Sequence, residues 1–165
     1  MKFVIFSERQ LWGGTIAAHN LCFLLEKMGC SASIFPGVPS TNNRVLFIWR
    51  YILYLIKDSL KALYIMLFPK SSIAARYYKG YVDLPVKGCK RKYLPWVDAD
   101  TIVIYTDVVK GNPLHANHVV RWMLYYNRFP NDDTWYTPRD IFFSYREQFN
   151  DLRLNPSGRF LKIFH

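Results

Sequence analysis

Cysteine is scarce in this 165-residue sequence, and its few copies suggest no pairing. Cys22, Cys30 and Cys89 form no CxxC motif, and their odd number leaves one without a partner. The pattern therefore argues against a disulfide framework and against a zinc site. It favours a reducing compartment. Cys22 lies within an apolar helical pattern, where a small buried thiol is common.

The sequence also lacks several other features that would each define a class of protein. It contains no GxGxxG fingerprint and no GK[ST] motif, which excludes the usual dinucleotide-binding loop and the P-loop. Only four apolar residues follow Lys2 before Ser7, which is too short a run for a signal peptide, so we expect a cytoplasmic protein. No internal repeat or low-complexity tract is present.

Acidic residues are few, and the resulting charge is concentrated in one segment. There are 22 Lys and Arg against 12 Asp and Glu, a net charge of +10. Residues 41–92 carry eleven positive and two negative side chains, whereas 1–40 carry three and two and 93–165 carry eight of each. With 51% apolar residues the chain can bury a core of its own, so disorder is excluded. This uneven distribution predicts that residues 41–92, and not the whole chain, interact with an anionic partner.

The apolar pattern of the first 36 residues predicts a strand, a helix and a second strand. Residues 2–7 form a short β-branched and aromatic run, Gly13 and Gly14 follow, and Thr15 offers an N-cap to a helix that Gly29 ends. Residues 31–35 then predict the second strand. This is a βαβ unit, which implies a parallel sheet.

The same alternation returns in the second half of the chain. Residues 101–105 predict a strand, 107–113 a loop and 114–126 a helix, and 142–143 and 160–164 predict two more short strands. The fold class is therefore α/β, an open Rossmann-like parallel sheet flanked by helices. The ends of the strands at 2–7 and 101–105 should line one edge of it, where such folds bind ligands.

Residues 45–68 predict a long apolar helix that Pro69 ends, within a basic helical insertion over 41–92. Its charged residues fall within an arc of about 100°, which leaves a wider apolar face than core packing requires. This face either lies on an anionic membrane or is buried against the sheet or a partner. A bilayer-spanning helix is disfavoured because Lys57, Asp58 and Lys61 lie near the middle of the segment.

Two features could carry chemistry at the predicted sheet edge. Gly13 and Gly14 would let a phosphate or sugar hydroxyl approach the main chain at a helix N-terminus, or they form a plain turn. Asp107 follows its strand directly and could accept a proton from a hydroxyl, or it caps the loop. Asp98 and Asp100 precede that strand and lie at the opposite edge, where we expect them to be solvated.

The sequence predicts no metal site. His115 and His118 lie three residues apart at the start of a predicted helix and could share one of its faces. No third ligand is evident near them.

Two stretches resemble bacterial glycosyltransferases of the GT-B fold. The opening strand, Gly13-Gly14 and the following helix resemble the start of that fold. Residues 99–105, Gly111-Asn112-Pro113-Leu114 and Val119-Val120-Arg121-Trp122 resemble a signature of a retaining branch that builds surface polysaccharides. Together these stretches cover about half of the chain. The chain departs from the pattern at 105–107, where Tyr-Thr-Asp stands in place of an element with Pro and Glu.

The resemblance implies an N-terminal acceptor-side domain over 1–165 that transfers a sugar from a nucleotide-sugar donor to a saccharide or lipid-linked acceptor. It implies that Asp107 orients the acceptor hydroxyl and that Gly13, Gly14 and Thr15 lie at the substrates. Asn112 and Arg121 would serve there as supports of the loop. Transfer would need no metal or other cofactor. No second sheet follows, so we expect the nucleotide-binding domain in a missing C-terminal part or in a second subunit. This chain would then be a piece of a longer protein, a truncated gene product or one half of a split enzyme.

Such acceptors often lie at the inner leaflet, so the resemblance also gives the basic segment a place on the membrane, as a peripheral anchor. The cations expected to contact anionic groups are Arg50, Lys57, Lys61, Arg76, Lys79, Lys90, Arg91 and Lys92.

Two alternatives of other classes remain. One is a binding module without catalysis, in which the basic segment grips single-stranded nucleic acid and which would show a steep salt dependence. That hypothesis explains the charge but not the βαβ opening or the apolar helix, so nucleic acid is disfavoured as the partner. The other alternative is a non-catalytic partner of a second subunit.

Overall fold

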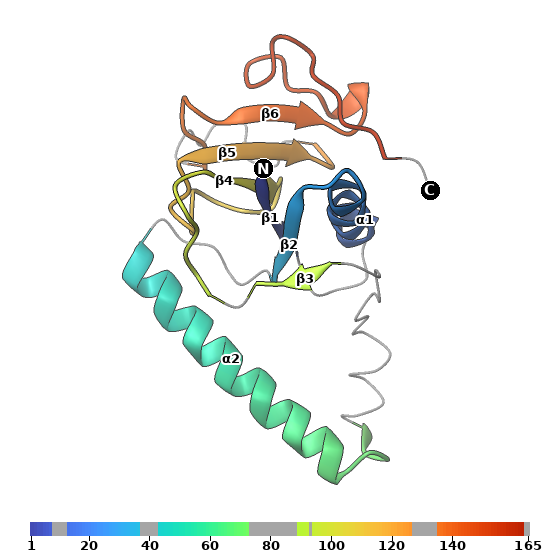
Figure 1. Ribbon diagram of the computed structural model, residues 1–165, viewed down its shortest axis with the longest axis vertical. Coiled ribbons are helices and arrows are strands. Elements are labelled where there is room, and N and C mark those ends of the chain that lie inside the picture. Colours follow the sequence, from blue (N-terminus) through green and yellow to red (C-terminus); the bar gives the residue numbers. More distant parts are fainter. Residues whose placement is uncertain (8–12, 37–42, 73–88, 93, 127–134, 164–165) are drawn as a thin grey trace.

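The fold is an open, six-stranded, all-parallel sheet with a helix on each face (Figure 1). The computed structural model describes residues 1–7, 13–36, 43–72, 89–92, 94–126 and 135–163. The strands, in the spatial order β3-β2-β1-β4-β5-β6, are β1 (Lys2–Ser7), β2 (Ser31–Pro36), β3 (Lys90–Arg91), β4 (Thr101–Thr106), β5 (His118–Met123) and β6 (Ile141–Ser144). The helices are α1 (Gly13–Lys27), α2 (Arg44–Leu67) and a 3-10 turn η2 (Glu147–Phe149). The predicted α/β class with an open Rossmann-like sheet is confirmed.

The β1–α1–β2 unit matches the sequence prediction except at the start of the helix. Gly29 has a φ of +78°, a left-handed conformation that glycine adopts without strain, and it ends α1 as predicted. The helix begins at Gly13, however, so Thr15 is its third residue and not its N-cap. The expected N-cap role of Thr15 is therefore wrong.

Each face of the sheet packs against a different helix. On one face, α1 buries Ala18, Leu21 and Cys22 against Ile5 and Ile104. On the other face, five residues in register form a row across five strands, and all but one are aromatic. The row is Phe35, Phe6, Tyr105, Arg121 and Phe142.

Helix α2 covers only part of the aromatic face. The side chain of Asn43 caps it by accepting a hydrogen bond from the Leu46 amide at 3.0 Å. Phe47 and Tyr51, in its N-terminal half, pack on Phe35. The C-terminal half runs past the sheet and away from the body of the molecule (Figure 1). The predicted long helix is confirmed, with bounds 44–67 in place of 45–68.

The basic segment contributes a strand as well as a helix. Lys90 and Arg91 form β3, which pairs with β2 at one edge of the sheet. This strand was not predicted, because two basic residues carry no apolar signal. A short, charged edge strand is one way in which proteins prevent further strand addition.

The helix predicted over 114–126 is wrong, because its centre is strand β5, paired in parallel with β4 and β6. Val119, Val120 and Trp122 are of types that favour strands. They face packed layers on both sides of the sheet, so the apolar run does not alternate.

The strand predicted over 160–164 is also absent from the described residues, which end at 163. Only one parallel bridge joins Phe160 to Ser144. Main-chain hydrogen bonds join this tail to Ser144 on both sides of the bridge. Two side chains add to them, since Trp122 Nε1 donates to the Leu161 carbonyl at 3.0 Å and the Tyr145 hydroxyl donates to the Ile163 carbonyl at 3.3 Å. The short strand predicted at 142–143 is confirmed as β6.

Candidate functional site

The carboxyl edge of the sheet carries both predicted site elements. β1 and β4 are neighbours, with Phe6 in register with Tyr105, so Ser7 and Thr106 end side by side. Asp107 follows β4 directly, and α1 begins after the loop that leaves β1. The predicted edge therefore exists, with a helix N-terminus and a carboxylate next to its central strands.

The two glycines in the first turn of α1 differ in their described surroundings. Among the residues that the structure describes, a Cβ added at Gly13 would meet nothing within 4 Å, whereas one at Gly14 would lie 3.2 Å from Leu124 Cδ1. Gly14 thus serves the packing of α1 on the segment after β5. Thr15 is buried, and no acidic residue stands in the first turn to offset the helix dipole. An anion is favoured at this end of α1.

Asp107 lies largely within the protein, with 6% of its surface exposed. Burial raises the pKa of the nearby Tyr136 phenol; the Arg121 guanidinium opposes this rise, and the Asp107 and Asp151 carboxylates add to it. Tyr136 therefore remains a protonated hydrogen-bond donor at neutral pH. Neither Tyr136 nor Asp151 was predicted, because each lies in an irregular segment without a motif.

Arg121 anchors the loop that carries Asp107. Its side chain and that of Asp140 are each 1% exposed and form an ion pair of 2.7 Å. Its Nη1 and Nη2 donate to the carbonyls of Val109 and Gly111 at 2.9 and 2.6 Å. The guanidinium also stacks 4.9 Å from the Tyr105 ring centroid. All three nitrogens thus bind protein acceptors that fix the course of residues 109–111.

Asn112 performs a similar task in the same loop. Its Oδ1 accepts from the Tyr105 hydroxyl and the Ala116 amide, both at 3.0 Å, and its Nδ2 donates to the Ala116 carbonyl at 2.8 Å. The Tyr105 hydroxyl also accepts from the Leu114 amide at 3.0 Å. The Gly-Asn-Pro-Leu turn is therefore fastened to the end of β4.

We expect Asn112→Ala to lower the free energy of unfolding by about 2–4 kcal/mol. The change leaves the buried Tyr105 hydroxyl and Ala116 amide without an acceptor. Urea denaturation measures the loss. Asn117→Ala is the control, since Asn117 is exposed and makes only a 3.4 Å bond, so it should cost under about 0.5 kcal/mol. Equal losses in the two variants would contradict this role of Asn112.

The predicted anion-contacting cations are divided between two places. Arg50, Lys57 and Lys61 are exposed on α2, and Lys90 and Arg91 are exposed on β3. The half-buried Lys92 follows β3, and its amide donates to the Ile34 carbonyl at 2.8 Å. Arg76 and Lys79 lie outside the described residues. α2 and β3 therefore present separate groups of cations.

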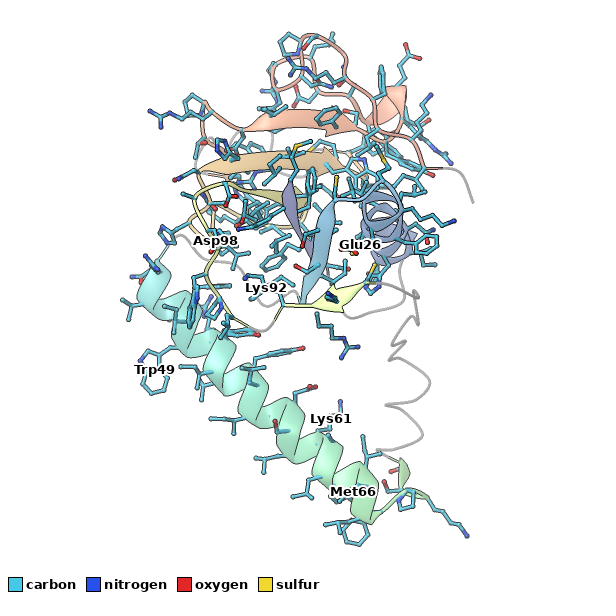
Figure 2. The ribbon with its side chains drawn as sticks, viewed as in Figure 1. Glu26, Trp49, Lys61, Met66, Lys92 and Asp98 are labelled. Atoms are coloured by element: carbon cyan, nitrogen blue, oxygen red, sulfur yellow. The ribbon has the colours of Figure 1, made fainter. Side chains whose placement is uncertain are left out.

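The outer face of α2 is apolar over its whole length. Four leucines recur every seventh residue, with Trp49, Ile56 and Leu63 between them, and all seven side chains are at least 42% exposed. The leucines are Leu46, Leu53, Leu60 and Leu67. Figure 2 shows Trp49 on the outer side of α2 and Lys61 on another side. Within the described part of the chain, no helix combines the length and hydropathy required to cross a bilayer.

The two histidines do not share a helix face, and the acidic pair lies at the opposite edge of the sheet from Asp107. His115 is a loop residue with a φ of +51°, and His118 begins β5, so the helix face expected to join them is wrong. Asp98 and Asp100 are exposed at the opposite edge, 2.8 and 3.5 Å from Lys2 Nζ. No three His, Cys, Asp or Glu side chains of the described ranges are grouped as metal ligands.

Comparison with family models, with curated proteins and with solved structures finds no match to this chain.

Proposed function

We propose that this chain is the acceptor-side α/β domain of a glycosyltransferase that acts at an anionic membrane surface. The observation that carries the proposal is that α1 and the buried Asp107 follow the neighbouring strands β1 and β4 at the same edge of the sheet. The nucleotide sugar and a second α/β domain or subunit complete the enzyme in this proposal. The likeness in sequence supplies the reaction class.

The two ends of a lipid-linked sugar would interact with different parts of this edge. The amides of the first turn of α1 favour a diphosphate, which can approach closely at Gly13. Asp107 can accept a hydrogen bond from a sugar hydroxyl and so raise its nucleophilicity toward the donor sugar. Arg121 and Asn112 hold the loop that carries this carboxylate, through contacts with protein atoms. Main-chain donors would stabilise the departing diphosphate without a metal.

The outer face of α2 suits a lipid surface better than a second copy of the same helix. Val45, Ile52 and Met66 are exposed beside the leucine row and make the face wider than a two-helix seam. Arg50 and Lys57 border its other side, so an antiparallel pair of these helices would bring like charges together. Anionic headgroups would instead complement them.

We expect Asp107→Asn to weaken binding of a short-chain prenyl diphosphate carrying one hexose by about 10- to 100-fold. A hydrogen bond to a charged group contributes about 1.5–3 kcal/mol, which sets this range. Gly13→Ala should weaken binding of the same probe and leave the melting temperature unchanged, because the added methyl would meet no atom of the described residues within 4 Å. Isothermal titration calorimetry measures the affinity of both variants for the probe, and thermal denaturation measures the melting temperature.

Asp98→Asn is the matched control, because Asp98 precedes β4 and Asp107 follows it at the other edge. Its affinity for the probe should equal that of the unaltered chain. If Asp107→Asn binds the probe as tightly as Asp98→Asn does, Asp107 has no place in an acceptor site.

A further inference from the structure

Two of the three cysteines meet between α1 and β3, although they lie far apart in the sequence. Cys22 is fully buried on α1, and Cys89 directly precedes β3 and packs against the same apolar cluster. The Cys89 thiol donates to the His19 carbonyl, one turn before Cys22, at 3.6 Å. Cys89 therefore packs on α1 within one turn of Cys22.

The two thiols differ in their readiness to react. Interaction with the Cys22 thiol lowers the pKa of the Cys89 thiol, and interaction with Cys89 together with burial raises the pKa of the Cys22 thiol. Cys89 is also the more accessible of the two, being only partly buried. Thiolate character and exposure are what make a cysteine nucleophilic. Glu26, which Figure 2 shows on α1, is the nearby carboxylate and opposes ionisation of both thiols.

We propose that Cys22 and Cys89 form a reversible disulfide in response to peroxide, which joins α1 covalently to the edge strand β3. The Cys89 thiolate attacks one oxygen of hydrogen peroxide, the O–O bond breaks, and the departing hydroxide takes a proton to become water. Cys22 then attacks the sulfur of the Cys89 sulfenic acid. The S–O bond breaks, and the released hydroxide takes the Cys22 proton. Two thiols and one peroxide give one disulfide and two waters.

This pair is compatible with a reducing compartment. There a disulfide forms during an oxidising event and is reduced again by the thiol pool. Cys30 lies just after the end of α1 and has no part in the contact. A transient bridge of this kind is distinct from a permanent disulfide framework. It is independent of the sugar-transfer proposal.

The full chain, treated with a small excess of hydrogen peroxide, should lose two of its three free thiols and regain both with dithiothreitol. Trypsin places each cysteine on its own peptide, at 10–27, 28–44 and 88–90. Mass spectrometry without reduction should therefore find the first and third peptides linked, at a mass two hydrogen atoms below their sum. The linked protein should remain monomeric on a non-reducing gel.

Cys30→Ser is the matched control and should form the same link to the same extent. Cys89→Ser and Cys22→Ala should each abolish the disulfide. If the Cys22 variant fails to fold, the peptide map of the unaltered chain still tests the proposal. Retention of all three thiols would overturn the proposal. So would a link to Cys30, or oxidation of Cys89 to the sulfinic acid without a link.

Discussion

Replacing Arg121 with methionine should lower the free energy of unfolding by about 3–5 kcal/mol, among the largest losses available to one side chain in this protein. The change leaves the Asp140 carboxylate, 1% exposed, without its partner, and breaking a buried ion pair from one side has a cost of this size. It also removes the donors to the Val109 and Gly111 carbonyls. Urea denaturation followed by circular dichroism measures the loss.

Arg153→Met is the matched control for this substitution. Arg153 also pairs with an aspartate, Asp151, at 2.9 Å, but 61% of its side chain is exposed. Such pairs contribute about 0–1 kcal/mol, so the control should lose little. The double variant Arg121→Met with Asp140→Leu should regain part of the loss, because no buried charge then remains unpaired. If Arg121→Met costs no more than the control, the ion pair does not anchor the Asp107 loop.

Charged residues on the outer face of α2 should reduce binding to anionic vesicles by about 100-fold or more. In the variant with Leu53→Glu and Ile56→Glu, two apolar side chains that are 46% and 51% exposed can no longer enter the lipid. Each such burial contributes about 1.5 kcal/mol or more, and together they amount to two orders of magnitude in partitioning. Flotation with vesicles of phosphatidylcholine and phosphatidylglycerol measures the bound fraction. The fold should be unaffected, because neither side chain belongs to the core.

Leu152→Glu is the control for this experiment, since Leu152 is 69% exposed on the segment after η2 and should not touch lipid. Removing charge from the border, with Arg50→Gln and Lys57→Gln, should weaken binding to anionic vesicles by about tenfold or more, at about 1 kcal/mol for each cation. The charge-removed variant should bind neutral vesicles as the unaltered chain does. Binding that is independent of anionic lipid, or equal for all variants, would exclude this face as the membrane contact.

The start of the fold could be predicted from local signals. In the β1–α1–β2 unit, an apolar run, a glycine pair, a helical period and Gly29 follow one another, and each signal lies within a few residues of the element it defines. Strand β4 and the long helix α2 were predictable for the same reason. β5 was assigned as a helix because a strand buried on both faces has no alternation, so its period cannot be told from that of a short buried helix.

Contacts between distant segments account for what the sequence could not reveal. Arg121 and Asp140 are 19 residues apart, in segments that only the pairing of β5 with β6 brings together. Cys22 and Cys89 meet only because β3, a strand with no apolar signal, pairs beside β2. The position of Asp107 at the sheet edge was predictable because it directly follows a strong strand. The proximity of Tyr136 was not, since it depends on the packing of an irregular segment.

Amide hydrogen exchange, with and without the short-chain prenyl diphosphate hexose, tests the proposed acceptor site most directly. It locates the bound probe in the unaltered chain without relying on any substitution. We expect slower exchange in the first turn of α1, at 13–16, and in the loop at 107–111, while β3 and the tail at 150–163 are unchanged. Exchange that is unaltered at both sites, or slowed only at the cations of β3, would contradict an acceptor site at the ends of β1 and β4.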